Sequence, residues 1–285
     1  MDGRVLVVIG AERYVAKTRS VAYGKRLQSI LMTVEVVTEP SDLQAAWSNQ
    51  YEKLAHVFAD ALGKKGRRIA EIGCGRGQLA IPLAKRAKNL QFVLVDRFVG
   101  TNYSKNYNAL LRNLRKTTLM RRAHIAVSDY MKWITTQNDG TYEAVVSSEF
   151  IPEIDSDETH RFIQECYRVL KPKGVTIHSF LSPIPRNLGQ KLLITADSNP
   201  LWTRTPPKEW FSPNPKLVIK ELREAGFYHI RKTSLRAHLI MKGDAARSWL
   251  KGVEVKANFY ETYKKVLIEW GLDVPDWVIV SGAKS

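Results

Sequence analysis

Cysteine is scarce in this chain of 285 residues, which carries two, Cys74 and Cys166. Two cysteines cannot build a disulfide framework, and no C-x-x-C spacing is present for zinc or redox chemistry. Long apolar runs are missing as well. The stretch from Val5 to Gly10 is too short for the core of a signal peptide, and no run approaches the roughly 18 residues that span a bilayer. We therefore expect a soluble, cytoplasmic protein with no membrane partner.

Acidic residues are also in short supply. The 28 Asp and Glu face 44 Lys and Arg, which leaves a formal net charge of +16. Such a balance attracts polyanions unless salt screens it. A nucleic-acid surface would need several basic residues on one face, with aromatic side chains to stack on unpaired bases. The sequence does not show whether such a face exists. Two interpretations therefore remain: the basic residues bind RNA, or they are scattered over the surface and solvated.

Short apolar strands alternate with amphipathic helices along most of the chain. This alternation is typical of parallel βαβ units and predicts an open α/β sheet. A helix capped by Asn214 and ended by Gly226 precedes the last two strands. The expected strands cover residues 68–73, 91–96, 124–129, 142–148, 174–181, 227–234 and 277–283.

One domain with two insertions accounts for this pattern. We expect residues 1–40 to be an N-terminal extension and residues 41–285 to form the domain, whose first helix starts with Ser41 and Gln44 in capping-box spacing. Residues 182–213 are rich in proline, which favours a long loop or lid over a helix. The second insertion, residues 241–275, has a helical pattern interrupted by a glycine.

A glycine-rich turn, Glu71-Ile72-Gly73-Cys74-Gly75-Arg76-Gly77, lies where the first strand passes into a helix. Glycines at alternate positions permit a sharp turn, and the helix start offers free N–H groups, so a nucleotide-like cofactor can bind there. The dinucleotide fingerprint G-x-G-x-x-G fails at Gln78 when counted from Gly73. Counted from Gly75 it ends on Ala80, which a variant of the fingerprint allows, so an NAD-type protein stays an alternative.

An acid two residues before G-x-G-x-G resembles the first motif of the class I S-adenosylmethionine-dependent methyltransferases, and the resemblance covers about residues 41–181. It implies a Rossmann-like, doubly wound, seven-stranded sheet with the last strand antiparallel, and S-adenosylmethionine as cofactor. Asp96, at a strand end, would accept hydrogen bonds from the ribose hydroxyls. Asp129 would contact the adenine amino group or simply cap the next helix. The expected cofactor-binding residues are Glu71, Gly73, Gly75, Gly77, Asp96, Asp129, Tyr130 and Ser147.

Glu149 is the candidate catalytic base, because the family topology places it beside the transferred methyl group. Contact with the cofactor's amino group and helix capping are alternatives for it. His178 is a weaker candidate, since a histidine inside an apolar strand is more often a satisfied core residue. The segment Ser147-Ser148-Glu149-Phe150 lacks the motif of enzymes that methylate exocyclic base amines. It also lacks the carboxylates of catechol-type enzymes, so we expect no metal.

The leading hypothesis for function is methyl transfer to an unidentified small or medium-sized acceptor by in-line displacement. One alternative is an RNA methyltransferase that uses the basic surface, and another is a non-catalytic nucleotide-binding protein. Aromatic residues of the two insertions, together with Trp47 and Tyr51, would wall the acceptor pocket. For residues 245–270 the helical spacing of the aromatics also fits a core face. These insertion aromatics are Trp202, Trp210, Phe211, Trp249, Phe259, Tyr260, Tyr263 and Trp270.

Overall fold

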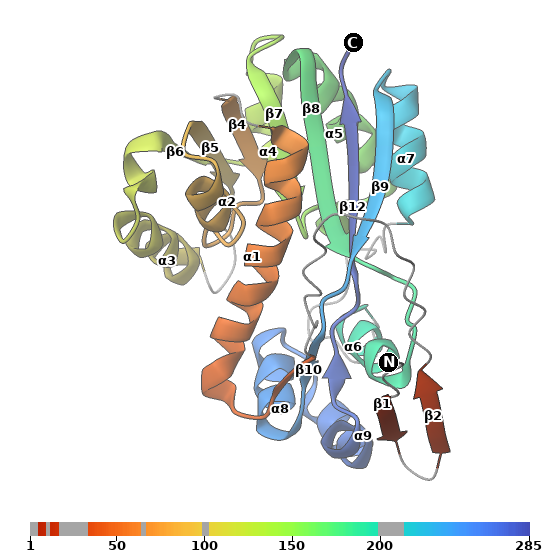
Figure 1. The fold of residues 1–285 in the computed structure, drawn as a ribbon. Coiled ribbons are helices and arrows are strands. Elements are labelled where there is room, and N and C mark those ends of the chain that lie inside the picture. Colours follow the sequence, from red (N-terminus) through yellow and green to blue (C-terminus); the bar gives the residue numbers. More distant parts are fainter. Residues whose placement is uncertain (1–4, 10–11, 17–33, 64–66, 99–102, 199–213) are drawn as a thin grey trace. The chain divides into compact units, whose positions relative to one another are not determined.

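The computed structural model describes residues 5–9, 12–16, 34–63, 67–98, 103–198 and 214–285. It divides into two units, Met1–Thr33 and Val34–Ser285. In the first unit, strands β1 (Val5–Ile9) and β2 (Glu12–Ala16) pair as an antiparallel hairpin (Figure 1). Among the described residues, no helix combines the length and the apolarity needed to cross a bilayer.

The second unit is built on a seven-stranded sheet in the order β6-β5-β4-β7-β8-β12-β9 (Figure 1). The first five strands of that order run parallel, and β12 pairs antiparallel with both β8 and β9. The predicted Rossmann-like sheet with an antiparallel last strand is thereby confirmed. The bounds are β6 (Ala123–Val127), β5 (Leu90–Asp96), β4 (Arg67–Ile72), β7 (Tyr142–Ser148), β8 (Leu170–Leu181), β12 (Trp277–Ala283) and β9 (Tyr228–Leu235).

Helices cover both faces of the sheet because its strands carry apolar residues on both sides. Helices α1 (Leu43–Leu62), α2 (Ala80–Arg86) and α3 (Tyr103–Arg115) pack on one face, which we call the α1 face. Helices α4 (Tyr130–Thr135), α5 (Ser156–Val169) and α7 (Pro215–Glu224) pack on the other, the α5 face. The chain order reverses between β4 and β7, and the carboxyl ends of parallel strands at such a switch point form the usual ligand site.

A smaller layer, the cap, lies beyond the carboxyl end of β8, where β12 begins (Figure 1). It has its own apolar core. The two insertions meet there, because Asn187 Nδ2 donates to Asp273 Oδ2 at 2.6 Å. Arg186 also pairs with Asp276, directly after the second insertion, at 2.6 Å. The cap contains α6 (Leu188–Ser198), α8 (Gly243–Gly252), α9 (Ala257–Glu269) and a three-stranded sheet of β3 (Glu35–Val37), β10 (Leu239–Met241) and β11 (Leu272–Asp273).

The described part of the first insertion, residues 182–198, is not the loop expected from its prolines, since α6 occupies Leu188–Ser198. The helix starts beyond Pro183 and Pro185, and Asn187 Oδ1 accepts a hydrogen bond from the Gln190 N–H at 2.9 Å, as an N-cap does. Its buried residues, Leu192 among them, pack in the cap core. Trp202, Trp210 and Phe211 lie outside the described residues.

The capping box expected at the start of α1 does not form. A 3₁₀ turn over Pro40–Asp42 precedes α1. Asp42 is the N-cap of α1, and its side chain makes no capping hydrogen bond. The Ser41 hydroxyl instead contacts Asp42 Oδ1 at 3.5 Å. The start of α7 is as predicted, because Asn214 Oδ1 accepts from the Lys216 N–H at 3.0 Å and Pro215 opens the helix.

Candidate active site

The glycine turn connects β4 to α2 with three glycines in the left-handed region. Their φ angles are 72° at Gly73, 50° at Gly75 and 79° at Gly77. The N–H groups of Gly73 and Cys74 both donate to the Val95 carbonyl, at 2.9 and 3.1 Å, which fastens the turn to β5. A residue with a Cβ would be strained at each of the three glycines, so the glycines are required by the main chain itself.

The three glycines differ in the space around them. A Cβ on Gly73 would lie 3.0 Å from the Phe150 ring, and a Cβ on Gly77 would lie 3.0 Å from Ile81 and Leu110. At Gly75 the nearest side-chain atom is 3.5 Å away, which is an ordinary contact. Gly73 and Gly77 therefore allow close internal packing, whereas Gly75 leaves the turn open on the side where a ligand would approach.

Asp96, the last residue of β5, is joined to this turn. Its Oδ2 accepts a hydrogen bond from the Gly75 N–H at 2.9 Å, and its Oδ1 accepts one from the Phe98 N–H at 2.7 Å. Each carboxylate oxygen has two lone pairs, so both oxygens retain acceptor capacity. The carboxylate is thereby held in one orientation and can still accept from two ribose hydroxyls.

Glu71 is 2% exposed, and its Oε2 has no hydrogen-bond partner. Burial, together with the charge of Asp96, raises its pKa to about 8, against a lowering by the hydrogen bond from the main chain of Ala80. A buried acid with an unpartnered oxygen is stabilised when a cationic donor pairs with it. The ammonium group of an amino-acid moiety, such as that of S-adenosylmethionine, is such a donor, so the residues here fit that cofactor.

Asp129 caps α4. Its Oδ1 accepts from the N–H groups of Met131 and Lys132, at 3.0 and 3.2 Å. Of the two roles that the sequence allowed for Asp129, the structure therefore shows helix capping, which uses only one of the two carboxylate oxygens. The Tyr130 ring packs edge-on against Phe150, with centroids 4.8 Å apart, and its hydroxyl is buried without a partner.

Ser147 and His178 face each other across β7 and β8, inside the α5 face. Ser147 Oγ lies 2.8 Å from His178 Nδ1, and Thr176 Oγ1 lies 2.7 Å from Nε2. Both ring nitrogens are engaged, and burial lowers the pKa of His178 to about 3. His178 is thus a satisfied core residue, and the Ser147 hydroxyl is used within the core. The hydroxyl that faces the opposite, α1 side is that of Ser148.

Glu149 follows β7 with a φ of 55°, which is strained for a residue with a side chain. Its N–H donates to the Ser179 carbonyl at 2.8 Å, and its Oε1 accepts from the Leu181 N–H at 2.7 Å. Burial raises the pKa of Glu149 to about 8, and the nearby charges of Asp197 and Glu153 add to the shift, against the Leu181 hydrogen bond. The structure therefore holds this carboxyl at the switch point in a form that can bind or release a proton near neutral pH.

The aromatic residues expected to wall an acceptor pocket divide into two groups. Phe259 and Tyr260 are buried in the cap core, which matches the core alternative. Tyr51 of α1 lies on the sheet side, with its ring 5.6 Å from that of Trp277 at the start of β12. Trp47, one turn earlier, packs against both the sheet core and the cap core.

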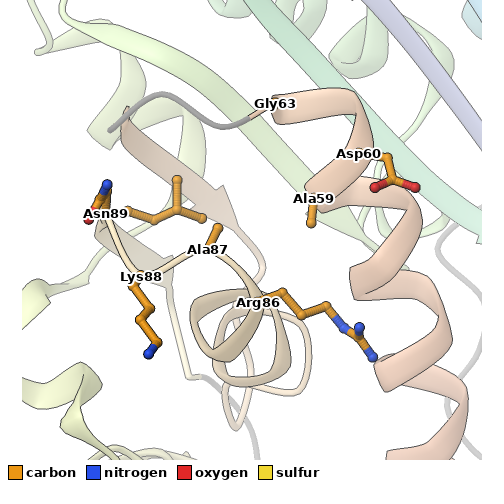
Figure 2. Close-up of a pocket in the computed structure, with 8 residues that line it drawn as sticks. Ala59, Asp60, Gly63, Arg86, Ala87, Lys88 and Asn89 are labelled. Carbon is orange, nitrogen blue, oxygen red and sulfur yellow. The ribbon is translucent and has the colours of Figure 1, made fainter.

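A surface pocket lies at the opposite end of the sheet (Figure 2). It is next to Leu90, the first residue of β5, whereas Asp96 is the last residue of that strand. The pocket is therefore separate from the glycine turn. It is lined by Ala59, Asp60, Gly63, Arg86, Ala87, Lys88, Asn89 and Leu90.

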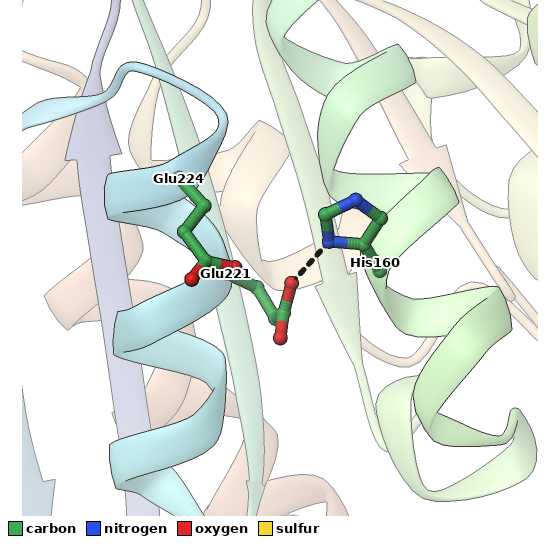
Figure 3. Close-up of side chains that lie close together, drawn as sticks. All are labelled: His160, Glu221 and Glu224. Carbon is green, nitrogen blue, oxygen red and sulfur yellow. Dashed lines mark hydrogen bonds and ion pairs between the residues drawn. The ribbon is translucent and has the colours of Figure 1, made fainter.

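A second cluster, formed by His160, Glu221 and Glu224, joins α5 to α7 (Figure 3). His160 Nδ1 lies 2.5 Å from Glu221 Oε2, and its Nε2 lies 2.8 Å from Gln164 Nε2. The potential ligand atoms of the three residues lie within 4.8 Å of one another. Chain spacing could not indicate this cluster, because its members come from two separate helices on the α5 face, away from the glycine turn.

Known proteins resemble the part of the chain that contains these residues. A family model described as a methyltransferase domain matches residues 69–174, the stretch that contains the glycine turn, Asp96, Asp129 and Glu149. Two solved structures share the fold. A cyclopropane-fatty-acyl-phospholipid synthase-like protein from Lactobacillus casei has a TM-score of 0.59 at 14% identity, covering 87% of this chain and 95% of that one. A SAM-dependent methyltransferase from Archaeoglobus fulgidus has a TM-score of 0.52 at 16% identity, covering 83% and 94%.

Two curated relatives match over part of the chain. A tRNA N(3)-methylcytidine methyltransferase of Drosophila melanogaster is 25% identical over 130 residues, 45% of this chain and 38% of the relative. A ubiquinone biosynthesis O-methyltransferase of Psychrobacter cryohalolentis is 24% identical over 156 residues, 52% of this chain and 56% of the relative. The matches thus span about half the length of these relatives, or less.

The order of the seven-stranded sheet and the glycine turn after β4 define a Rossmann-like fold. Residues 69–174 match a methyltransferase domain, and the fold is shared with solved S-adenosylmethionine-dependent methyltransferases, which together support a class I methyltransferase of this kind.

Proposed function

We propose that this protein transfers a methyl group from S-adenosylmethionine to a small or medium-sized acceptor. The observation that carries the proposal is the joint arrangement at the carboxyl ends of β4 and β5. Gly75 leaves the turn open, Asp96 is held by the Gly75 N–H, and Glu71 keeps a buried oxygen without a partner. This combination supports a ligand with a ribose and a cationic amino group.

Each cofactor contact has a candidate residue. Asp96 would accept from the ribose hydroxyls, Glu71 would pair with the ammonium group, and the free Oδ2 of Asp129 would accept from the adenine amine, with Tyr130 beside it. Gly73, Gly75 and Gly77 shape the turn. We transfer the role expected of Ser147 to Ser148, because the Ser147 hydroxyl is bonded to His178.

The cofactor supplies an electrophilic methyl group on a sulfonium, so the protein has to align the acceptor and remove its proton. Glu149 is the proposed base. Its carboxyl lies at the switch point, and its raised pKa of about 8 suits proton uptake near neutral pH. The test is transfer of labelled methyl from S-adenosylmethionine to a mixed metabolite extract, compared between the wild-type protein and Glu149→Gln. Loss of label in the variant with unchanged S-adenosylhomocysteine binding supports the assignment.

An RNA acceptor is the second candidate, favoured by the net charge of +16 and by the tRNA methyltransferase among the relatives. Binding of total tRNA should then weaken by orders of magnitude between roughly 50 and 200 mM salt. Absence of RNA binding at low salt eliminates this candidate. A protein that binds the cofactor but transfers no methyl to either extract or RNA would be the non-catalytic alternative. A cytoplasmic location is part of the proposal, supported by two buried free thiols, Cys74 and Cys166.

A further inference from the structure

Buried polar atoms without a hydrogen-bond partner are concentrated on one side of the sheet. Within the described part of the chain, five residues with such atoms lie on α1 or on the α1 side of the strand ends. We call these five residues the polar layer. They are Gln50, Glu71, Ser148, Ser179 and Trp277.

The sheet register brings the strand members of the polar layer together. Ser148 of β7 pairs directly with Ser179 of β8, and Ser179 pairs with Ile279 of β12. Ile279 packs in the core of the α1 face, so the paired serine side chains point to that side. Trp277 is two residues before Ile279 and therefore points to the same side.

Helix α1 supplies the other wall. Tyr51 contacts the Trp277 ring. Burial and the charges of Glu149 and Glu71 raise the pKa of Tyr51, whereas the Ser148 hydroxyl, near enough for a weak hydrogen bond but outside ideal geometry, lowers it. Gln50 is fully buried, and neither its amide nitrogen nor its amide oxygen has a partner. Because neighbours four residues apart share a helix face, Gln50 lies between the cap core at Ala46 and the sheet core at Leu54.

Unpartnered buried polar atoms are costly, at about 1–3 kcal/mol each. Several of them on one side of one sheet end indicate that a polar ligand completes their hydrogen bonds. Glu71 belongs with the cofactor, as argued above. Ser148, Ser179 and Gln50 lie toward β8, α1 and the cap, beyond the glycine turn, so their ligand is a second molecule.

The ionisable side chains around this layer are mostly acids, although the chain as a whole is basic. Glu149 lies between Ser148 and the cap, and the carboxyl of Asp197 on α6 acts on it together with Glu153. Glu153 is influenced in turn by Asp96 and partly neutralised by the exposed Arg97. Three acids thus gather at the end of the polar layer: Glu149 directly after β7, Glu153 in the 3₁₀ turn Ile151–Glu153, and Asp197 on α6. A cation bound there would relieve their mutual repulsion.

On the basis of the proposed function, we propose that the methyl acceptor is a small amine that binds in its protonated form. Its ammonium group lies among Glu149, Asp197 and Glu153, and its other polar atoms bond to Ser148, Ser179 and Gln50. The ammonium gives one proton to the Glu149 carboxylate, which frees the nitrogen lone pair. The nitrogen–methyl bond forms as the carbon–sulfur bond breaks, the sulfur retains that electron pair, and the positive charge passes to the methylated nitrogen.

The test uses probes of one shape and different charge on the S-adenosylhomocysteine-loaded protein. Calorimetry with S-adenosylhomocysteine comes first, and failure at this step overturns the proposed function rather than the choice of acceptor. Benzylamine, benzyl alcohol and benzoate are then compared by thermal shift. We expect benzylamine to raise the melting temperature and the other two to leave it unchanged, because a ligand stabilises the folded state that binds it. An equal or larger shift with benzyl alcohol or benzoate overturns the amine assignment.

Two variants and a control locate the amine. Asp197→Asn and Ser179→Ala should weaken benzylamine binding at least tenfold and three- to tenfold, respectively, with S-adenosylhomocysteine affinity within twofold of wild type. Asp244→Asn, which changes an exposed acid in the first turn of α8, should alter neither. Benzylamine binding unchanged in both test variants overturns the location, and labelled methyl recovered on oxygen rather than nitrogen from a mixed acceptor pool overturns the chemistry.

Discussion

The Gly75 N–H donates to Asp96 Oδ2 at 2.9 Å, which ties the open glycine of the turn to the acid at the end of the neighbouring strand. The two residues are far apart in sequence but lie side by side because β4 and β5 are adjacent parallel strands. This bond fixes the carboxylate before any ligand arrives. Preorganisation of this kind lowers the entropy cost of binding a ribose.

Gly75→Ala, compared with Gly140→Ala, should distinguish two effects of an added side chain: loss of the space that a ligand needs and strain in the main chain. Gly75 has a φ of 50° and Gly140 a φ of 62°, and a Cβ at either position meets no close neighbour in the protein. Alanine should cost each variant about 1–3 kcal/mol in the free energy of unfolding. Only Gly75→Ala should also weaken S-adenosylhomocysteine binding, by at least tenfold in calorimetry. Equal affinities in the two variants would show that the turn is structural.

Asp129→Asn should distinguish helix capping from adenine recognition. Asparagine is as good an N-cap as aspartate, and its amide oxygen can take over both hydrogen bonds now made by Oδ1. The amide nitrogen would then replace Oδ2 and present a donor where the adenine amine needs an acceptor. We expect an unchanged melting temperature and a several-fold loss of S-adenosylhomocysteine affinity. If affinity and stability both stay at wild-type values, Asp129 is a cap alone.

Two acids with raised pKa values should make the unliganded protein less stable as pH rises. The pKa values of Glu71 and Glu149 rise from an ordinary 4.5 to about 8 on folding. Between these pH values the folded state holds protons that the unfolded state has released, so rising pH favours unfolding. Glu149→Gln removes one of these groups. Its stability relative to wild type should therefore increase between pH 4.5 and 8, by less than about 1.4 kcal/mol per pH unit.

Chemical denaturation across that pH range measures this difference. Glu143→Gln is a useful comparison, because interactions with Lys171 and Arg68 lower the pKa of Glu143 despite partial burial. That variant should lose stability relative to wild type at neutral pH and converge with it in acid. Parallel stability curves for wild type and Glu149→Gln would contradict the assigned environment of Glu149.

His178→Asn should damage the core without changing the proton chemistry. The substitution disturbs hydrogen bonds to Ser147 and Thr176, and each buried hydroxyl left unpartnered costs about 1–3 kcal/mol. The pH dependence of methyl transfer should keep its wild-type shape, whereas Glu149→Gln should remove the acid limb, on which wild-type transfer falls as the Glu149 carboxylate takes up a proton. A shifted pH profile of methyl transfer in His178→Asn would indicate that His178 acts as the catalytic base.

Local signals in the sequence predicted most of the sheet. Strands β7 and β12 have the predicted bounds, 142–148 and 277–283, because apolar runs ended by polar residues are local features. The N-cap of α7 was equally visible. Helix α6 was missed because the prolines around it outweighed its short apolar pattern, and β3, β10 and β11 are too short to show a period.

The side of the sheet on which a residue lies was harder to predict. Ser147 and Ser148 are adjacent and chemically identical, yet one bonds to His178 in the core and the other faces α1. Both faces of a parallel sheet are apolar, so hydrophobic alternation does not assign them. Gln50 gave no signal either, because a single amide in an amphipathic helix is ordinary until its burial is known.

Calorimetry with S-adenosylhomocysteine and NAD, run in parallel on the wild-type protein and Gly75→Ala, tests the account most directly. We predict one S-adenosylhomocysteine bound per wild-type chain, at least tenfold weaker binding to the variant, and no heat of binding with NAD. Tight NAD binding together with no response to S-adenosylhomocysteine would contradict it.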